Sequence, residues 1–160
     1  MHAENEIYIH APAREVYELA AAVERWPDFL PHYRWARVLE THEDHRLLEM
    51  AARRDRIPLW WCAEQRLFPD EPGITFRHVR GITTGMEVAW TFEPRSDGCL
   101  VRIEHHLRMR GGALGSLLAD RLIRPQFVQV IASRTLRCFK ERLEAQAAAV
   151  RRSSQLGREA

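Results

Sequence analysis

The sequence predicts a single α+β domain, in which a twisted antiparallel sheet of seven strands wraps around one long C-terminal helix. Two observations predict this class. From Tyr33 to Gly111 the chain holds only short runs separated by turn-forming residues, as in a sheet built from hairpins. From Leu114 to about Val150, apolar residues instead recur at helical spacing. A helix packed on the apolar side of a twisted sheet leaves a cavity wherever the facing side chains are small.

The first predicted elements are a short strand and two small helices. Glu6 to His10 alternates polar with β-branched residues, which predicts a strand. Pro12 suits a first helical turn, and the apolar residues of Ala13 to Glu24 fall on one helical face. Trp26 to Pro31 is rich in proline and aromatic residues, so it permits at most one further helical turn.

Six runs complete the predicted sheet. They are Tyr33 to Glu40, Arg46 to Arg54, Leu59 to Phe68, Ile74 to Arg80, Met86 to Glu93 and Cys99 to Met109. In the fifth run, Val88 and Trp90 lie on the apolar side and are expected to form core or cavity wall. In the last run His105 shares the apolar side and His106 the polar side, so only His105 can face a cavity.

The C-terminal helix is expected to roof that cavity. Its apolar stripe steps from bulky to small or polar and back to bulky, through Phe127, Val128, Ile131, Ala132, Thr135, Leu136, Phe139 and Leu143. We expect the small step at Ala132 and Thr135 to cover the cavity. Pro125 lacks an amide proton, which predicts a kink or break near Arg124. Such a kink would let Leu114 to Ile123 act as a gate.

Length and composition indicate one domain. In a chain of 160 residues with 46% hydrophobic content, residues 1–150 can form one core, and 151–160 are expected to be a flexible basic tail. The 24 basic and 22 acidic residues are mixed along the chain, which argues against nucleic-acid binding. We see neither a leader-like N-terminus nor an apolar run of membrane-spanning length, so we expect a cytoplasmic protein without membrane insertion. The three widely spaced cysteines suit neither disulfides nor a zinc site, and we expect no metal and no cofactor.

The order of elements and two local motifs resemble a known superfamily. Ala11-Pro12 leads into the helix of residues 13–24 and then into Glu24-Arg25-Trp26-Pro27-Asp28-Phe29-Leu30-Pro31, and Trp90-Thr91-Phe92-Glu93-Pro94 lies within residues 85–98. This arrangement resembles the START-like helix-grip superfamily, which includes the birch pollen allergens. Within it the chain is similar to the polyketide cyclase/dehydrase branch, which contains aromatase/cyclases and coenzyme Q-binding START proteins. The resemblance spans roughly Ile7 to Leu143 and implies a helix-grip fold.

The aromatase/cyclases resembled here are thought to bend a poly-β-ketone chain between aromatic walls and to assist aldol closure and dehydration with an arginine and a tyrosine. The matching positions in this chain are Trp26, Tyr33, Arg66, Arg80 and Trp90. By this resemblance Arg66 is the cation that stabilises developing negative charge, and Tyr33 offers its hydroxyl. The resemblance also implies a hydrophobic small-molecule ligand and, for a polyketide enzyme, an acyl carrier protein as partner.

The strand from Leu59 to Phe68 has two possible inward sides. One side carries Trp60, Cys62, Glu64 and Arg66, and the other carries Trp61, Ala63, Gln65 and Leu67. The family register favours the Arg66 side, although Cys62 and Glu64 stand where the aromatases tend to carry a tryptophan and a serine. An ion pair between Glu64 and Arg66 would make the Arg66 guanidinium less available to an oxyanion of the ligand, unless Glu64 is itself the general base. A solvent-exposed pair of the two remains the alternative.

The candidate catalytic residues are therefore Arg66, Tyr33 and Glu64. The candidate ligand-binding residues are Trp26, Trp60, Cys62, His78, Arg80, Val88, Trp90, His105, Val128, Ile131, Ala132 and Thr135. Three functions stay open: a polyketide cyclase/aromatase, a non-catalytic carrier of a quinone or other lipid, and an interaction protein that uses an exposed sheet face. A homodimer through an aliphatic side of the C-terminal helix is compatible with the sequence but not required by it.

Overall fold

The computed structural model describes residues 2–54, 56–107 and 125–156. Their elements follow the expected order: β1 (His2–Ile9), α1 (Ala13–Ala21), the 3-10 turn η1 (Val23–Arg25), α2 (Trp26–Phe29), β2 (Tyr33–Thr41), β3 (Arg46–Arg54), β4 (Ile57–Phe68), β5 (Gly73–Gly81), β6 (Met86–Arg95), β7 (Gly98–Leu107) and α4 (Pro125–Leu156). The predicted α+β helix-grip fold, with its seven-stranded sheet and long C-terminal helix, is confirmed.

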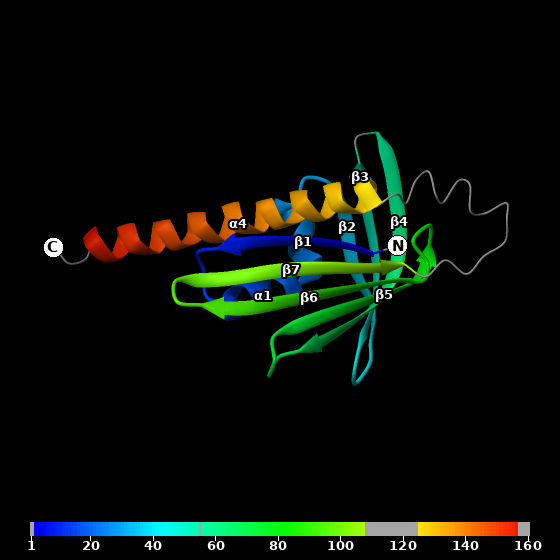
Figure 1. Ribbon diagram of the computed structural model, residues 1–160, viewed down its shortest axis with the longest axis horizontal. Coiled ribbons are helices and arrows are strands. Elements are labelled where there is room, and N and C mark those ends of the chain that lie inside the picture. The colour runs from blue at the N-terminus through cyan, green and yellow to red at the C-terminus, as the bar shows by residue number, and fades with distance from the viewer. Residues whose placement is uncertain (1, 55, 108–124, 157–160) are drawn as a thin grey trace.

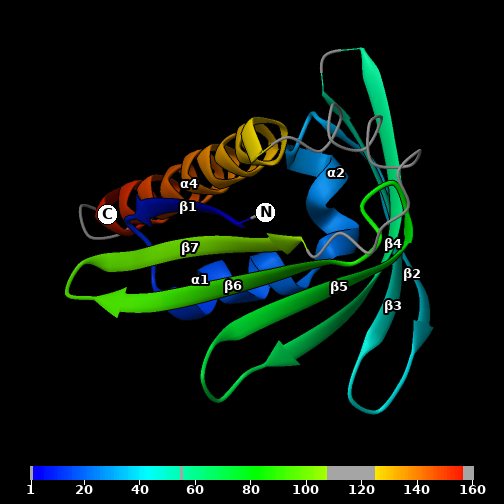
Figure 2. The same ribbon diagram turned by 45° about the vertical axis from the view of Figure 1, so that its right-hand side comes forward.

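The seven strands form one antiparallel sheet in the order β1-β7-β6-β5-β4-β3-β2. The sheet is strongly curved, with β2, β3 and β4 standing steeply across the direction of the other strands (Figures 1 and 2). Helix α4 runs alongside β1, while α1 lies beneath β6 and β7 on the concave side (Figure 1). Because one face of each strand is apolar, this curvature brings the apolar faces of distant strands around a common interior.

Helix α4 supplies the other side of that interior. Its innermost residues, Leu136, Phe139 and Leu143, are buried, with Phe139 fully so. Pro125 stands at its first position, where a proline costs no hydrogen bond. The predicted gate of residues 114–123 and the side chain of Phe127 lie outside the described residues. The helix continues to Leu156, so the expected flexible tail is helical over residues 151–156.

An irregularity in β5 matters for the site. In the pairing of β4 with β5, Cys62 faces Arg80 and Ala63 faces His78, so Val79 is an extra residue in a β-bulge. Gly81 follows with a φ of 95°, and a Cβ there would lie 2.3 Å from the Trp60 carbonyl oxygen. Only glycine fits this close approach. The turn that follows brings Ile82 and Thr83 to the rim of the interior.

None of the helices in the described ranges is long and apolar enough to cross a lipid bilayer.

Candidate ligand-binding cavity

The interior between sheet and α4 holds a cavity with predominantly apolar walls. Its empty volume is about 760 Å³ when the open mouth is included. The described residues that line it are Trp26, Tyr33, Met50, Leu59, Trp61, Phe76, His78, Ile82, Thr83, Met86, Val88, Trp90, Ile103, His105, Val128, Ile131, Ala132 and Thr135. None of these is Asp, Glu, Lys or Arg. Ile82 lines the cavity and is also exposed, so the β5–β6 turn borders the mouth.

Helix α4 roofs the cavity at the step expected from the sequence. Val128, Ile131, Ala132 and Thr135 all line it. Ala132 is buried, and its small methyl group leaves space beneath the helix. Elsewhere on the stripe, larger side chains fill the corresponding space. Beyond this step, Phe139 closes the interior by packing edge-on against Trp26 at 5.9 Å between ring centroids.

An aromatic cluster forms the closed end of the cavity. Trp26, the first residue of α2, is 2% exposed and is the centre of the cluster. Its ring centroid lies 5.3 Å from that of Tyr33 and 5.6 Å from that of Trp90. The Trp26 indole Nε1 is buried and has no hydrogen-bond partner among the described residues. An indole nitrogen can only donate, so this position can satisfy an acceptor oxygen on a ligand.

Two histidines supply polar atoms to the wall. His78 stacks on Trp61 with nearly parallel rings, and its Nδ1 lies 2.6 Å from the Thr83 hydroxyl. His105 keeps its buried Nδ1 without a partner in the described structure. Burial lowers the pKa of His78 to about 3 and that of His105 to about 4. Both rings are therefore uncharged at neutral pH, and the wall presents neutral hydrogen-bonding groups only.

Tyr33 and Thr135 add two hydroxyl groups to the wall. Tyr33 sits at the start of β2 and lines the cavity together with Thr135 of α4, whose Oγ1 lies 2.8 Å from Nε2 of His32. Burial raises the pKa of Tyr33 far above its ordinary value. Its hydroxyl therefore keeps its proton and can act as a hydrogen-bond donor across the physiological pH range.

The side of β4 that faces the cavity is the one with Trp61, not the Arg66 side that the family resemblance favours. Trp61 lines the cavity, and Ala63 and Gln65 are fully buried. Gln65 is acceptable there because its side chain accepts from the Arg46 Nε and donates to the Ala21 carbonyl. The sequence left this choice open because each side carries one tryptophan and at least one polar residue.

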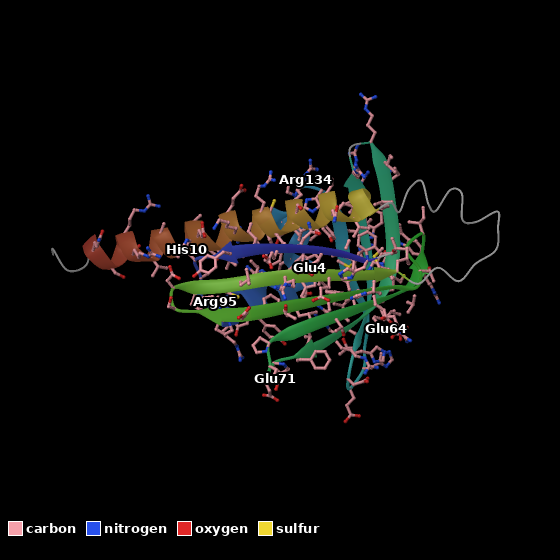
Figure 3. The ribbon with its side chains drawn as sticks, in the orientation of Figure 1. Glu4, His10, Glu64, Glu71, Arg95 and Arg134 are labelled. Atoms are coloured by element: carbon pink, nitrogen blue, oxygen red, sulfur yellow. The ribbon has the colours of Figure 1, made fainter. Side chains whose placement is uncertain are left out.

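Arg66 and Glu64 consequently lie on the outer face of the sheet. Arg66 is half-exposed and pairs with Asp44 at 3.2 Å, and Glu64 pairs with Arg77 at 2.7 Å. In Figure 3 Glu64 lies at the lower right of the sheet, away from α4, whereas Arg134 lies above α4. The expectation that Arg66 and Glu64 face the cavity is wrong.

Three further candidates also lie off the cavity. Trp60 is 40% exposed on the outer face, and Cys62 is buried on that face, where burial raises the pKa of its thiol. Alternation with Ile74, Phe76 and His78 along the strand predicts an inward Arg80 side chain. The bulge at Val79 reverses this alternation and turns Arg80 to the exposed side.

The remaining candidates come together around one space. Trp26, Tyr33, His78, Val88, Trp90 and His105 surround the cavity below the four α4 residues. Sequence reasoning missed Trp61 and His32. The alternation of Leu59, Trp61 and Ala63 could have indicated Trp61, but His32 stands in a turn between Pro31 and β2, where no periodic pattern exists.

Comparison with known proteins relates this chain to polyketide enzymes. Residues 9–134 match the family model described as polyketide cyclase/dehydrase and lipid transport. The chain belongs to this polyketide cyclase/dehydrase family. One family relative, a candidate polyketide cyclase of Streptomyces halstedii, is 30% identical over 105 residues, which are 63% of this chain and 95% of the relative.

Other comparisons agree on the family and the fold. The bifunctional cyclase/dehydratase of the actinorhodin polyketide synthase of Streptomyces coelicolor is 32% identical over 106 residues, which are 59% of this chain and 31% of that longer protein. The crystal structure of the Zhui aromatase/cyclase from Streptomyces sp. R1128 superposes with a TM-score of 0.81 at 17% identity, covering 92% of this chain and 95% of that one. At this identity the likeness shows the fold.

Proposed function

We propose that this protein is a polyketide cyclase/aromatase, which holds an uncharged poly-β-ketone chain in the cavity and assists its aldol closure and dehydration. The observation that carries the proposal is a wall of aromatic and aliphatic side chains in which the polar groups are all neutral, namely Tyr33, Thr83, Thr135, His78 and His105. A charged ligand would lose its hydration there without gaining a counter-ion. Family membership supports the same ligand class.

In this proposal Tyr33 has the role that the resemblance gave to Arg66. The enolate or alkoxide oxygen that develops during ring closure accepts the Tyr33 hydroxyl proton as a hydrogen bond. In a water-poor site such a donor is effective, and removing one donor of this kind typically slows a reaction by about 10²-fold or more. Glu64 has no part in the step, because its carboxylate binds Arg77 on the outer face.

The proton that leaves the ketone chain needs an acceptor. His105 offers the unpartnered Nδ1 of an uncharged ring. With a pKa of about 4 the His105 ring is a weak base, so proton transfer to it depends on the Tyr33 hydrogen bond that stabilises the enolate as it forms. His105 then returns this proton to the alkoxide formed by the new carbon–carbon bond, and loss of water completes the aromatic ring.

Reconstitution with a minimal polyketide synthase and its acyl carrier protein tests the proposal. The wild type is expected to change the distribution of cyclised products. Tyr33→Phe is expected to form the products that depend on the protein about 10²-fold more slowly. His105→Gln removes the proton acceptor and is expected to be at least as damaging. A product distribution identical with and without the wild-type protein would refute the cyclase role.

A second candidate is a non-catalytic carrier of a quinone or another lipid. It is favoured by the apolar walls and by the lack of any formally charged residue among the described cavity-lining side chains, and lipid transport is part of the family description. The carrier predicts transfer of a quinone between vesicles at a rate that Tyr33→Phe leaves unchanged. Ring-closure activity that Tyr33→Phe removes would support the enzyme over the carrier.

A further inference from the structure

Two histidines meet on the outer face of the sheet, where β1 begins and β7 ends. His2 of β1 stands directly opposite His106 of β7 in the strand pairing, and Figures 1 and 2 show these two strand ends side by side. The two Nδ1 atoms lie 3.3 Å apart, and the ring centroids lie 4.6 Å apart. The neighbouring residues Ala3 and His105 are buried, so the histidine pair faces away from the cavity.

The separation of the two nitrogens matches that of two ligands on one metal ion. Histidine nitrogens bind zinc at about 2.0–2.1 Å with tetrahedral angles, which places two such nitrogens about 3.3–3.4 Å apart. Imidazole is a ligand for zinc, copper and nickel ions. Two ring nitrogens that already lie at this spacing can therefore chelate such an ion without a change in the strand pairing.

Glu104 gives His106 the outer support that metal-binding histidines usually have. The Glu104 Oε2 lies 3.5 Å from Nε2 of His106. A carboxylate there favours the tautomer with the proton on Nε2, which leaves the lone pair of Nδ1 for a metal. In the metal-free protein the Nδ1–H of His2 then donates to that lone pair. When an ion binds, this proton moves through solvent to Nε2 of His2, and the ion takes its place.

The surroundings of the pair are open to water and negatively charged. Both histidines are exposed. Glu4 stands opposite Glu104 in the next positions on the same face, and Arg102 pairs with both Glu4 and Glu6. Three carboxylates against one guanidinium attract cations to this part of the sheet. The described residues hold no group of three or more metal-ligating side chains, so water completes the coordination of an ion held by the pair.

We propose that His2 and His106 form a surface site for a divalent transition-metal ion, with Zn²⁺ as the ion that their spacing fits. The site is separate from the cavity and independent of the proposed cyclase function. The two histidines are 104 positions apart in the chain, so no local motif indicates the site in the sequence. Only the folded chain brings the two rings together, and a bound ion therefore stabilises the folded state.

The ion would fasten a strand that supports the roof of the cavity. Strand β1 stands at one end of the described sheet, beside β7. It also contacts α4, where Nδ2 of Asn5 donates to Oγ of Ser133 at 2.8 Å. A metal bridge between β1 and β7 thus holds the strand on which the first half of α4 rests.

Zinc binding by the untagged protein tests the proposal. Titration with zinc chloride in competition with a chromophoric zinc indicator is expected to show one site per chain in the wild type. His2→Gln and His106→Gln should each lose this site, because a chelate needs both nitrogens. His10→Gln is the control, since His10 is exposed and lies beside a single carboxylate, Asp97, and it should bind zinc as the wild type does. No zinc site in the wild type, or a site that survives in His2→Gln or His106→Gln, would overturn the proposal.

Thermal melts with and without zinc test the link to the folded state. Zinc is expected to raise the melting temperature of the wild type and of His10→Gln, with reversal by EDTA, and to leave that of His106→Gln unchanged. A rise of equal size in His106→Gln would place the ion elsewhere and contradict the site. Glu104→Gln keeps the side-chain shape and should weaken zinc binding by about 10- to 100-fold, and unchanged affinity in this variant would refute the supporting role of Glu104.

Discussion

At the scale of single residues, the chemistry of this site depends on which face of β4 points inward. Arg66 and Tyr33 both match positions of the aromatase pattern, but the structure brings only Tyr33 to the cavity. The sequence could indicate Tyr33 only through the resemblance to the aromatase/cyclases. It could not decide between the two sides of β4, and it could not reveal the bulge at Val79 that turns Arg80 outward.

Arg66→Ala is expected to leave ligand binding and product distribution unchanged. The Arg66–Asp44 pair lies on the outer face with both side chains more than half exposed, so its loss costs no more than about 1 kcal/mol of the free energy of unfolding. Urea unfolding and the reconstituted cyclisation assay measure the two effects. Trp61→Ala on the inward side is the contrasting variant and should lower both stability and binding. A large loss of activity in Arg66→Ala would contradict the placement of Arg66.

At the scale of elements, α4 combines two functions on one stripe. Its first half, with Ala132 and Thr135, covers the cavity, and its next turns, with Leu136, Phe139 and Leu143, hold the helix on the sheet. This division could be predicted from the sequence, because side-chain size along a helical stripe is directly readable. The end of the helix could not, since the residues beyond Val150 are exposed and lack an apolar pattern that would extend or end it.

Phe139→Ala is expected to destabilise the fold by about 3–5 kcal/mol, because Phe139 is fully buried in the aromatic cluster and truncation leaves a cavity. Chemical denaturation measures the change. Val130→Ala is the matched control on the same helix, since Val130 is 43% exposed and should change stability by less than about 0.5 kcal/mol. Similar losses in both variants would show that α4 is not anchored through this stripe.

At the scale of the whole molecule, the fold keeps three histidines uncharged inside. His32, His78 and His105 have pKa values of about 4, about 3 and about 4, each lowered mainly by burial. In the unfolded chain histidine binds a proton near pH 6.5. Between about pH 6.5 and pH 4 the unfolded state therefore holds more protons than the folded state, and acid favours unfolding.

The free energy of unfolding is expected to fall as the pH drops from 6.5 to 4.5, by up to about 1.4 kcal/mol per pH unit for each of these histidines. Thermal melts across this range measure the slope. His78→Gln removes one titrating group and should flatten the slope. A slope that His78→Gln does not alter would contradict the uncharged buried state of His78.

The central claim is that the space beneath Ala132 binds an uncharged hydrophobic molecule. Native mass spectrometry of the protein, purified gently from its own cells, tests this claim most directly when the wild type is compared with Ala132→Phe and with the control Val130→Phe on the exposed side of α4. We predict a bound small-molecule mass in the wild type and in Val130→Phe, and its loss in a folded Ala132→Phe. No bound mass in the wild type, or equal occupancy in all three proteins, would contradict the claim.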